Sequence, residues 1–152
     1  MLPELEILKR ILLAAGMGAL LGLEREVRAK SAGLRTNILI AVGSALFTIV
    51  SLELGGGSTT DQTRIAAQIV TGMGFLGAGA IIRTRGNVHG LTTAATVWVN
   101  AALGMAAGGG DYRLAGIGFG VTMAVLLILP PIEREFDRRF VRRTGRDRPT
   151  GV

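Results

Sequence analysis

Polar side chains at helical spacing inside apolar sequence are the residues of this chain that could do chemistry. Thr92, Thr96 and Asn100 recur every four residues, so on a helix they share one face, and Gly104 continues the line. Asn100 lies about 14 Å along such a helix, close to the middle of a bilayer if the helix crosses one. An amide there needs a partner on another helix or water in a cavity. We favour the interhelical hydrogen bond over a contact with a substrate.

A second polar stripe lies in another apolar stretch, where Asp61, Arg64 and Gln68 share a helix face. Asp61 has the position and the chemistry of a helix cap, and Arg64 lies one turn on as its ion-pair partner. Glu24 stands four residues before Arg28, a spacing that predicts an ordinary ion pair at a helix end. We favour these structural roles over a binding site.

Enzyme chemistry has little support. The chain has no cysteine and one histidine, His89, which excludes cysteine-bound zinc, a cysteine nucleophile and a His-rich metal centre. His89 has no carboxylate beside it from which to build a Ser-His-Asp arrangement, and no phosphate-binding GxxxxGK[ST] motif occurs. We expect a protein that is not an enzyme and that needs no cofactor.

The elements that must position these residues are apolar runs of 17 to 20 residues, close to the ~20 that a helix needs to cross a bilayer. There are five of them, at residues 5–23, 36–52, 65–82, 91–107 and 112–131. Ion-coupled carriers usually need a charged side chain within the membrane, and the second to fifth runs have none at depth. The pattern predicts an all-α fold, a polytopic membrane bundle of five transmembrane helices.

The distribution of basic residues predicts the orientation of that bundle. Thirteen of the 17 Lys and Arg residues follow the first, third or fifth run. The positive-inside rule therefore places the N-terminus outside and the C-terminus in the cytoplasm. This arrangement accounts for the positive net charge of the chain. We therefore expect membrane lipid as a partner and no nucleic acid.

We divide the chain into a membrane domain, residues 1–131, and a basic tail, residues 132–152. In the tail, Ile132, Phe136 and Phe140 recur every four residues among arginines. That pattern is typical of an amphipathic helix lying on an anionic leaflet. A solvated tail that only sets the orientation is an equal alternative.

Glycines at close-packing spacings indicate where helices touch. Gly18 and Gly22 form a GxxxG pair, and we expect this face to pack two copies of the chain into a homodimer or larger assembly. Four more gather around Phe75: Gly72, Gly74, Gly77 and Gly79. Helix packing is the favoured role of these four, and a broken helix lining an ion path is the alternative.

Three sequence blocks carry a family resemblance. The first has GLERE at 22–26 and AGLRTN at 32–37, the second has Asp61, RIAAQIV at 64–70 and GFLGAG at 74–79, and the third has GLTTAATVW at 90–98. In order and spacing they resemble the transmembrane domain of the MgtC/SapB family of bacterial inner-membrane proteins, from about residue 8 to residue 130. The resemblance implies a five-helix membrane domain.

The resemblance also implies a link to growth in low magnesium and, in pathogens, to survival inside the host. Members of the family are thought to bind and modulate other membrane proteins, the ATP synthase among them. A divalent-cation transporter is the alternative function, with Mg²⁺ as an unproven ligand. The positions typical of the family are Glu24, Arg35, Asn37, Asp61, Arg64, Gln68, Asn87, Thr93 and Thr96.

Two features limit what carries over from the family. His89 stands where an arginine is common. Longer members continue into a cytoplasmic regulatory domain, and the role of that domain is not carried over to this chain.

Glu24 and Asp61 are the carboxylates that the resemblance suggests for Mg²⁺. The predicted arrangement places Glu24 at the inner side of the membrane and Asp61 at the outer side, separated by most of ~30 Å of hydrocarbon. Ligands of Mg²⁺ lie about 2 Å from the ion, so one site cannot use both.

Overall fold

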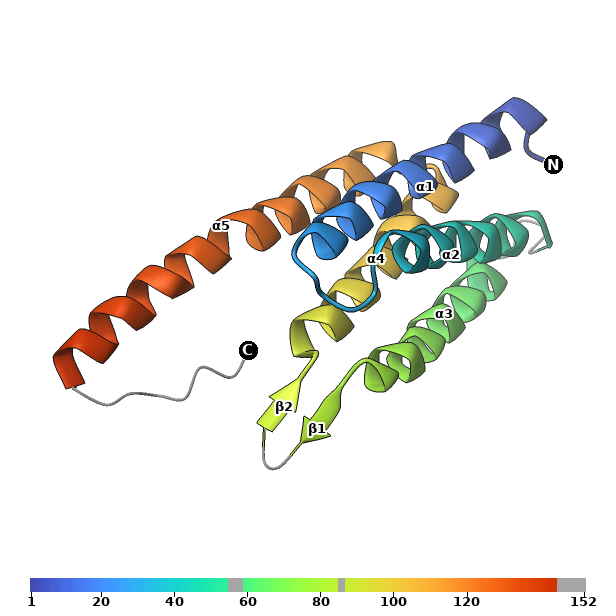
Figure 1. Cartoon of the computed structure of the whole chain (residues 1–152). Coiled ribbons are helices and arrows are strands. Elements are labelled where there is room, and N and C mark those ends of the chain that lie inside the picture. Colours follow the sequence, from blue (N-terminus) through green and yellow to red (C-terminus); the bar gives the residue numbers. More distant parts are fainter. Residues whose placement is uncertain (55–58, 85–86, 145–152) are drawn as a thin grey trace.

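The computed structural model describes residues 1–54, 59–84 and 87–144, and within them the chain is a bundle of five helices with one short hairpin (Figure 1). The helices are α1 (Glu4–Val27), α2 (Leu34–Leu54), α3 (Thr59–Gly79), α4 (Leu91–Gly109) and α5 (Tyr112–Thr144). The hairpin strands β1 (Ile82–Thr84) and β2 (Asn87–His89) stand between α3 and α4. The all-helical fold that the sequence predicts is confirmed.

Helix α4 is central, because it packs against each of the other four helices (Figure 1). Gly104 of α4 lies against Ala41 of α2 and Gly108 lies against Ala45, so α2 and α4 run parallel. Gly18 of α1 contacts α2 further along α2 than Gly22 does, so α1 and α2 run antiparallel. Successive helices therefore run up and down through the bundle.

The interior is built from small residues that let backbones touch. A Cβ atom added to Gly104 would lie 2.3 Å from the backbone oxygen of Ala41, and one added to Gly108 would lie 2.5 Å from that of Ala45. At Gly18 the corresponding distance is 2.6 Å, to the backbone oxygen of Asn37. Side chains larger than hydrogen do not fit at these crossings, which is the packing expected where helices associate in lipid.

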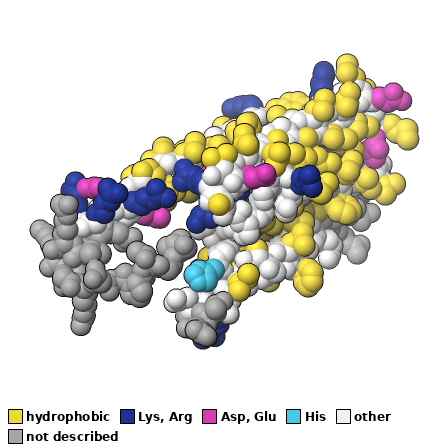
Figure 2. All heavy atoms as spheres, viewed as in Figure 1, with side chains coloured by type: hydrophobic (Ala, Val, Ile, Leu, Met, Phe, Trp, Pro, Cys, Tyr) yellow, Lys and Arg dark blue, Asp and Glu magenta, His cyan; other side chains and the backbone are white. Residues whose placement is uncertain are grey.

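Large apolar side chains lie on the outside of the bundle. Phe75 is 81% exposed and Leu39 is 71% exposed, while Ala14, Ala41 and Ala45 are fully buried. Figure 2 shows the apolar side chains spread over the helices and a group of basic side chains along the C-terminal half of α5. Soluble proteins rarely expose apolar surface on this scale. The exterior is that of a protein whose solvent is partly lipid.

Two helices of the described residues are long and apolar enough to cross a membrane: residues Leu34–Leu54 and Tyr112–Phe136. The apolar part of α3, Ala66–Gly79, is shorter. The helix α1 carries charged residues at both ends, and α4 carries the Thr and Asn stripe, which reduces the apolar character of each. The number of spans and their orientation therefore stay predictions.

The segment after α3 forms an antiparallel hairpin in which Ile82 pairs with His89 and Arg83 with Val88. Gly90 ends it with a left-handed φ of 88°, and a Cβ atom there would lie 2.0 Å from the backbone oxygen of Ala80. This close approach requires glycine.

The fifth helix extends beyond the predicted apolar run 112–131, because it continues through Pro130 and Pro131 to Thr144. Each proline lacks an N–H group, so two carbonyl groups one turn earlier lose their helical donors. The helix nevertheless continues as one element of 33 residues, about 50 Å long. Its C-terminal half extends beyond the bundle (Figure 1). The division into a membrane domain and a tail stays a prediction.

Candidate functional site

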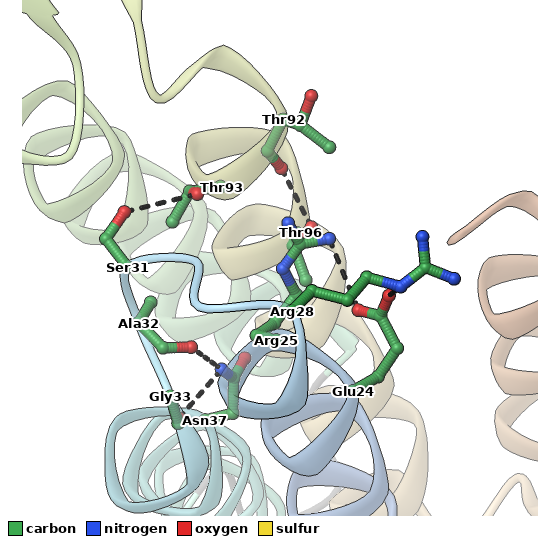
Figure 3. A network of polar contacts seen from close by, with 10 residues as sticks. All are labelled: Glu24, Arg25, Arg28, Ser31, Ala32, Gly33, Asn37, Thr92, Thr93 and Thr96. Carbon is green, nitrogen blue, oxygen red and sulfur yellow. Dashed lines mark hydrogen bonds and ion pairs between the residues drawn. The ribbon is translucent and has the colours of Figure 1, made fainter. Parts of the chain in front are cut away.

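A buried polar cluster lies where α1 ends, α2 begins and the first turns of α4 pass beside them (Figure 3). We define the polar cluster by its side chains, which are Glu24, Arg25, Arg28, Asn37, Thr93, Thr96 and Asn100. Asn37 and Asn100 are fully buried, Arg25 is 4% exposed and Glu24 is 8% exposed. Five of the predicted site residues thus meet in one place: Glu24, Asn37, Thr93, Thr96 and Asn100.

The Asn37–Asn100 pair joins α2 to α4. The Nδ2 atom of Asn100 donates to the backbone oxygen of Asn37 at 2.7 Å and to its Oδ1 atom at 3.1 Å. The predicted interhelical hydrogen bond of Asn100 is confirmed. Its Oδ1 atom and the hydroxyl of Ser44 are buried, and the described part of the chain gives neither a hydrogen-bond partner. A buried polar atom of this kind is costly unless water or a ligand supplies the missing donor.

The pair also shows the height of Asn100 relative to α2. Asn100 is the tenth residue of α4, whereas Asn37 is the fourth residue of α2. Because the two are hydrogen-bonded side by side in parallel helices, α4 begins about 9 Å before α2 does. Asn100 therefore lies level with the first turn of α2. Its depth in a bilayer stays a prediction.

An ion-pair group forms the part of the polar cluster nearest the surface. Nε of Arg28 lies 2.6 Å from Oε1 of Glu24, and Nη1 of Arg25 lies 3.3 Å from Oε2 (Figure 3). The predicted Glu24–Arg28 pair is confirmed, while the sequence reasoning missed the part played by Arg25. Two guanidinium groups share one carboxylate, so the group carries one net positive charge. The position of Arg25 between two glutamates in the sequence does not predict this shared contact, because the contact depends on the burial of the Arg25 side chain.

The connection between α1 and α2 holds the polar cluster from one side. Ala29 and Ala32 adopt left-handed φ angles of 52° and 58°, which cost a non-glycine residue free energy. The backbone oxygens of Ala32 and Gly33 both accept from Nδ2 of Asn37. The Ser31 hydroxyl donates to Oγ1 of Thr93 at 3.3 Å, which ties the connection to α4. The strained turn is therefore fixed by the same side chains that fill the site.

Glu26 is a further residue that the sequence reasoning missed. Its Oε2 atom accepts a hydrogen bond from the backbone N–H of Leu34 at 2.8 Å, so it caps the first turn of α2. A carboxylate at this position also suits the positive end of the helix dipole. The available signal was weak, because a cap normally lies next to its helix and Glu26 stands eight residues before Leu34.

A second group of polar side chains lies at the other end of the bundle, where α4 turns into α5. Nη1 of Arg10 donates to the backbone oxygen of Gly108 at 2.8 Å, and its Nε donates to Oε1 of Glu6 at 3.0 Å. The Tyr112 hydroxyl donates to the same Glu6 oxygen. A cation beside the last carbonyl groups of α4 is favoured by the helix dipole. This group fastens the start of α1 to the α4–α5 turn.

The remaining predicted site residues do not join the polar cluster. Arg35 and Asn87 are exposed, and Gln68 is exposed on α3. Asp61 and Arg64 belong to the first turns of α3, at the opposite end of the bundle from Glu24 (Figure 1). Their side chains lie outside the described residues, so the predicted cap and ion pair are untested.

The predicted packing glycines fall into two groups. Gly18 and Gly22 are buried against α2 of the same chain, so the homodimer face predicted there is used within one chain. A Cβ atom added to Gly77 would lie 3.6 Å from the backbone oxygen of Ala94 in α4. The other three have open space within 4 Å of an added Cβ atom: Gly72, Gly74 and Gly79. These three glycines touch no other helix among the described residues, so a packing role for them stays a prediction.

Metal binding by carboxylates finds no support in this geometry. The described residues contain no group of three or more His, Asp or Glu side chains placed to hold an ion. A cavity of about 330 Å³ between α3 and α4 is apolar, with Ile69, Met73, Trp98 and Met105 in its lining. A lining of this kind suits an apolar chain rather than a cation.

The helical fold, the apolar exterior and the two long apolar helices together indicate a membrane protein. Comparison with known sequences then gives its family. Residues 11–135 match the MgtC family, and the chain belongs to that family. The resemblance seen in the three sequence blocks is confirmed. No solved structure matches the chain.

Several curated relatives are similar over most of this chain. It is 48% identical over 128 residues to the protein named "Putative magnesium transporter YhiD" of Escherichia coli K12, covering 80% of this chain and 59% of that protein. It is 45% identical over 134 residues to Protein MgtC of Brucella abortus strain 2308, covering 88% of this chain and 55% of that protein. Protein MgtC of Salmonella typhimurium is 41% identical over 140 residues, covering 86% and 59%. The chain thus spans little more than half the length of these relatives.

Proposed function

We propose that this chain is a multi-pass protein of the bacterial inner membrane that acts as a regulatory and interaction module rather than as an enzyme. In this proposal five helices cross the membrane, with the N-terminus outside and the C-terminus in the cytoplasm. The module supports growth in low magnesium and, in a pathogen, survival in the host. It acts by binding other inner-membrane proteins, for which the ATP synthase is the candidate partner.

The charge of the polar cluster is the observation that carries this proposal against transport. Glu24 lies 2.6 Å from Arg28 and 3.3 Å from Arg25. A Mg²⁺ ion at this carboxylate would meet two guanidinium groups within a few ångströms, and like charges in a buried site repel strongly. The polar cluster is therefore suited to holding helices in one arrangement that a partner can recognise, and it is poorly suited to a divalent cation.

A divalent-cation transporter or channel is the second candidate. The printed name of the Escherichia coli relative supports it, as does the unpartnered Oδ1 atom of buried Asn100. An oxygen of this kind could accept a bond from a hydrated ion. The polar cluster would then be one end of a path, and the protein would carry magnesium without a bound cofactor.

Growth in low magnesium tests the proposed module. A strain that lacks its own MgtC-family gene should grow at limiting magnesium when this chain is supplied. Glu24→Gln should abolish the rescue, because it leaves Arg25 and Arg28 without a counter-charge. Glu133→Gln, at an exposed position of α5, is the matched control and should rescue fully. Failure of the wild-type chain to rescue, with normal membrane levels, would contradict the proposal.

A further inference from the structure

The apolar cavity of about 330 Å³ between α3 and α4 opens on the side of the bundle. Its floor is buried, with Ile69 of α3 and Ala101 of α4 almost inaccessible. Its rim is about half exposed, and it includes Val70 of α3, Trp98 of α4 and Leu114 of α5. The cavity therefore opens sideways, which in the five-span arrangement proposed above is towards the bilayer. We call it the side groove.

The lining of the side groove offers little to a polar ligand. The hydroxyl of Thr48 donates to the backbone oxygen of Ser44 at 2.8 Å, so it is already used. The indole N–H of Trp98 remains as a single side-chain donor, whereas a bound water needs two to four polar partners. Met73 and Met105 have unbranched, flexible side chains that adapt to an irregular apolar occupant. The side groove is therefore suited to an apolar and flexible ligand.

The shape of the side groove favours a thin chain over a helix. Ile69 packs with Val97 and Ala101 beneath it, so α3 and α4 touch along its floor. The valley between two touching helices is narrower than a third helix, which is about 10–12 Å across with its side chains. Trp98 and Met105 stand two turns apart, so the side groove follows α4 for about 10 Å. A slot that runs along the helices has the direction of an acyl chain in a bilayer.

A free cation stands at the end of the side groove beside the α4–α5 turn. Arg113 directly precedes the lining residue Leu114, is exposed and has no ion pair with any residue that the structure describes. Around the same turn, Glu6 and Arg10 pair with each other, and Asp111 accepts a hydrogen bond from the backbone N–H of Leu114. A guanidinium group binds phosphate oxygens through two parallel hydrogen bonds. The charge at this end therefore suits a phosphate group.

We propose that the side groove binds one acyl chain of a phospholipid whose phosphate pairs with Arg113. The proposal rests on the proposed five-span arrangement, which places the α4–α5 turn at the outer surface and makes the ligand a lipid of the outer leaflet. An acyl chain in the side groove touches protein on several sides, and many weak dispersion contacts then hold it more firmly than a chain on a convex helix face. The narrow slot together with the cation at its end selects a phospholipid over water, a free anion or a helix.

Quenching of Trp98 tests the acyl-chain site, because Trp98 is the only tryptophan of the chain. Phosphatidylglycerol with brominated acyl chains, titrated into the protein in detergent, should quench its fluorescence with a saturable curve. Ala102→Phe places a ring in the lining and should raise the lipid fraction at half-maximal quenching about tenfold. Ala124→Phe, at an exposed position of α5 outside the lining, is the matched control and should leave the curve unchanged. Identical curves for wild type and Ala102→Phe would overturn the proposal and leave the side groove to be covered by a helix.

A second titration tests the phosphate contact. Arg113→Gln should raise the half-maximal fraction of brominated phosphatidylglycerol about threefold, within the range for an exposed ion pair. Lys9→Gln removes another exposed cation from the same end of the bundle and should have no effect. Brominated diacylglycerol, which has no phosphate, should bind wild type and Arg113→Gln equally, and free glycerol phosphate should not compete. Unchanged phosphatidylglycerol binding in Arg113→Gln, or competition by glycerol phosphate, would contradict the phospholipid.

Failure of the proposal can be separated from failure of the five-span arrangement. In vesicles made entirely of brominated phospholipid, Trp98 should be quenched in both wild type and Ala102→Phe, because α4 lies in the bilayer in either case. Absence of quenching in both would contradict the five-span arrangement and the lipid site together. Strong quenching in these vesicles, with identical detergent curves for the two proteins, would contradict the lipid site alone.

Discussion

Single residues of the polar cluster differ sharply in what their loss should cost. Asn100→Ala removes both hydrogen bonds to Asn37 and leaves the Asn37 side chain without its interhelical partner. We expect the free energy of unfolding to fall by about 1–2 kcal/mol, the range for buried hydrogen bonds between helices in lipid. Thr92→Val, at an exposed position of the same helix, should change it by less than about 0.5 kcal/mol. Unfolding by denaturing detergent in mixed micelles measures both, and equal losses would contradict the role of the pair.

The two partners of the Glu24–Arg28 pair should also behave unequally. Glu24→Gln leaves Arg25, whose side chain is 5% exposed, as an uncompensated buried charge. Breaking such a pair typically costs about 3–5 kcal/mol. The Arg28 side chain is 31% exposed, so Arg28→Gln should cost about 1 kcal/mol or less, because Glu24 keeps Arg25. The same unfolding assay separates the two variants, and a larger loss in Arg28→Gln would contradict the assigned roles.

At this scale the sequence predicts pairs within one helix and misses pairs that depend on the turn. The spacing of Glu24 and Arg28 is readable because Glu24 lies in the last turn of α1 and Arg28 is the C-cap residue of that helix. Glu26 reaches the backbone of Leu34 only because the connection turns back through left-handed residues at Ala29 and Ala32. Alanine is not a residue whose presence predicts such a conformation, so the sequence gives no warning of the turn.

Among the secondary-structure elements, the contact between α2 and α4 depends on two glycines. Gly104→Ala places a methyl group on the backbone oxygen of Ala41 and should lower the free energy of unfolding by about 1–3 kcal/mol. Gly116→Ala meets open space in α5 and should be neutral or stabilising by up to about 1 kcal/mol. Thermal stability in detergent compares the two alanine variants directly. Equal stability would mean that α2 and α4 do not touch as described.

The GxxxG pair on α1 predicted a close helix contact correctly but not the partner of that contact. Gly18 and Gly22 contact α2 of the same chain, where we expected a second copy. A glycine pair shows that a backbone can approach and says nothing about which backbone does so. The same limit applies to Asn100. The sequence showed that its amide needs a partner, but the height of Asn100 relative to α2 depends on how far α4 is shifted along α2. The connections between helices set how far one helix is shifted along another, and the spacing of residues within a helix does not predict this shift.

For the whole molecule, charge asymmetry along the chain makes the orientation testable. Alkaline phosphatase is active outside the cytoplasm, so a fusion within residues 55–57 should be active and a fusion at the C-terminus should be inactive. The reason is that most Lys and Arg residues follow the first, third and fifth apolar runs. A reporter that is active only inside the cell, fused at the same two sites, should give the opposite pattern. An active C-terminal phosphatase fusion would contradict the proposed orientation.

The measurement that most directly tests whether this chain is a module or a transporter is magnesium entry into proteoliposomes that contain this chain alone. A magnesium-sensitive dye inside the vesicles should report the same slow entry as in vesicles without protein, because Arg25 and Arg28 neutralise the buried carboxylate that a cation would use. The same preparation should be shown to be folded and correctly inserted by protection of Gly72→Cys from an impermeant maleimide. Saturable magnesium entry that depends on Glu24 or Asn100 would contradict the account and establish the transporter instead.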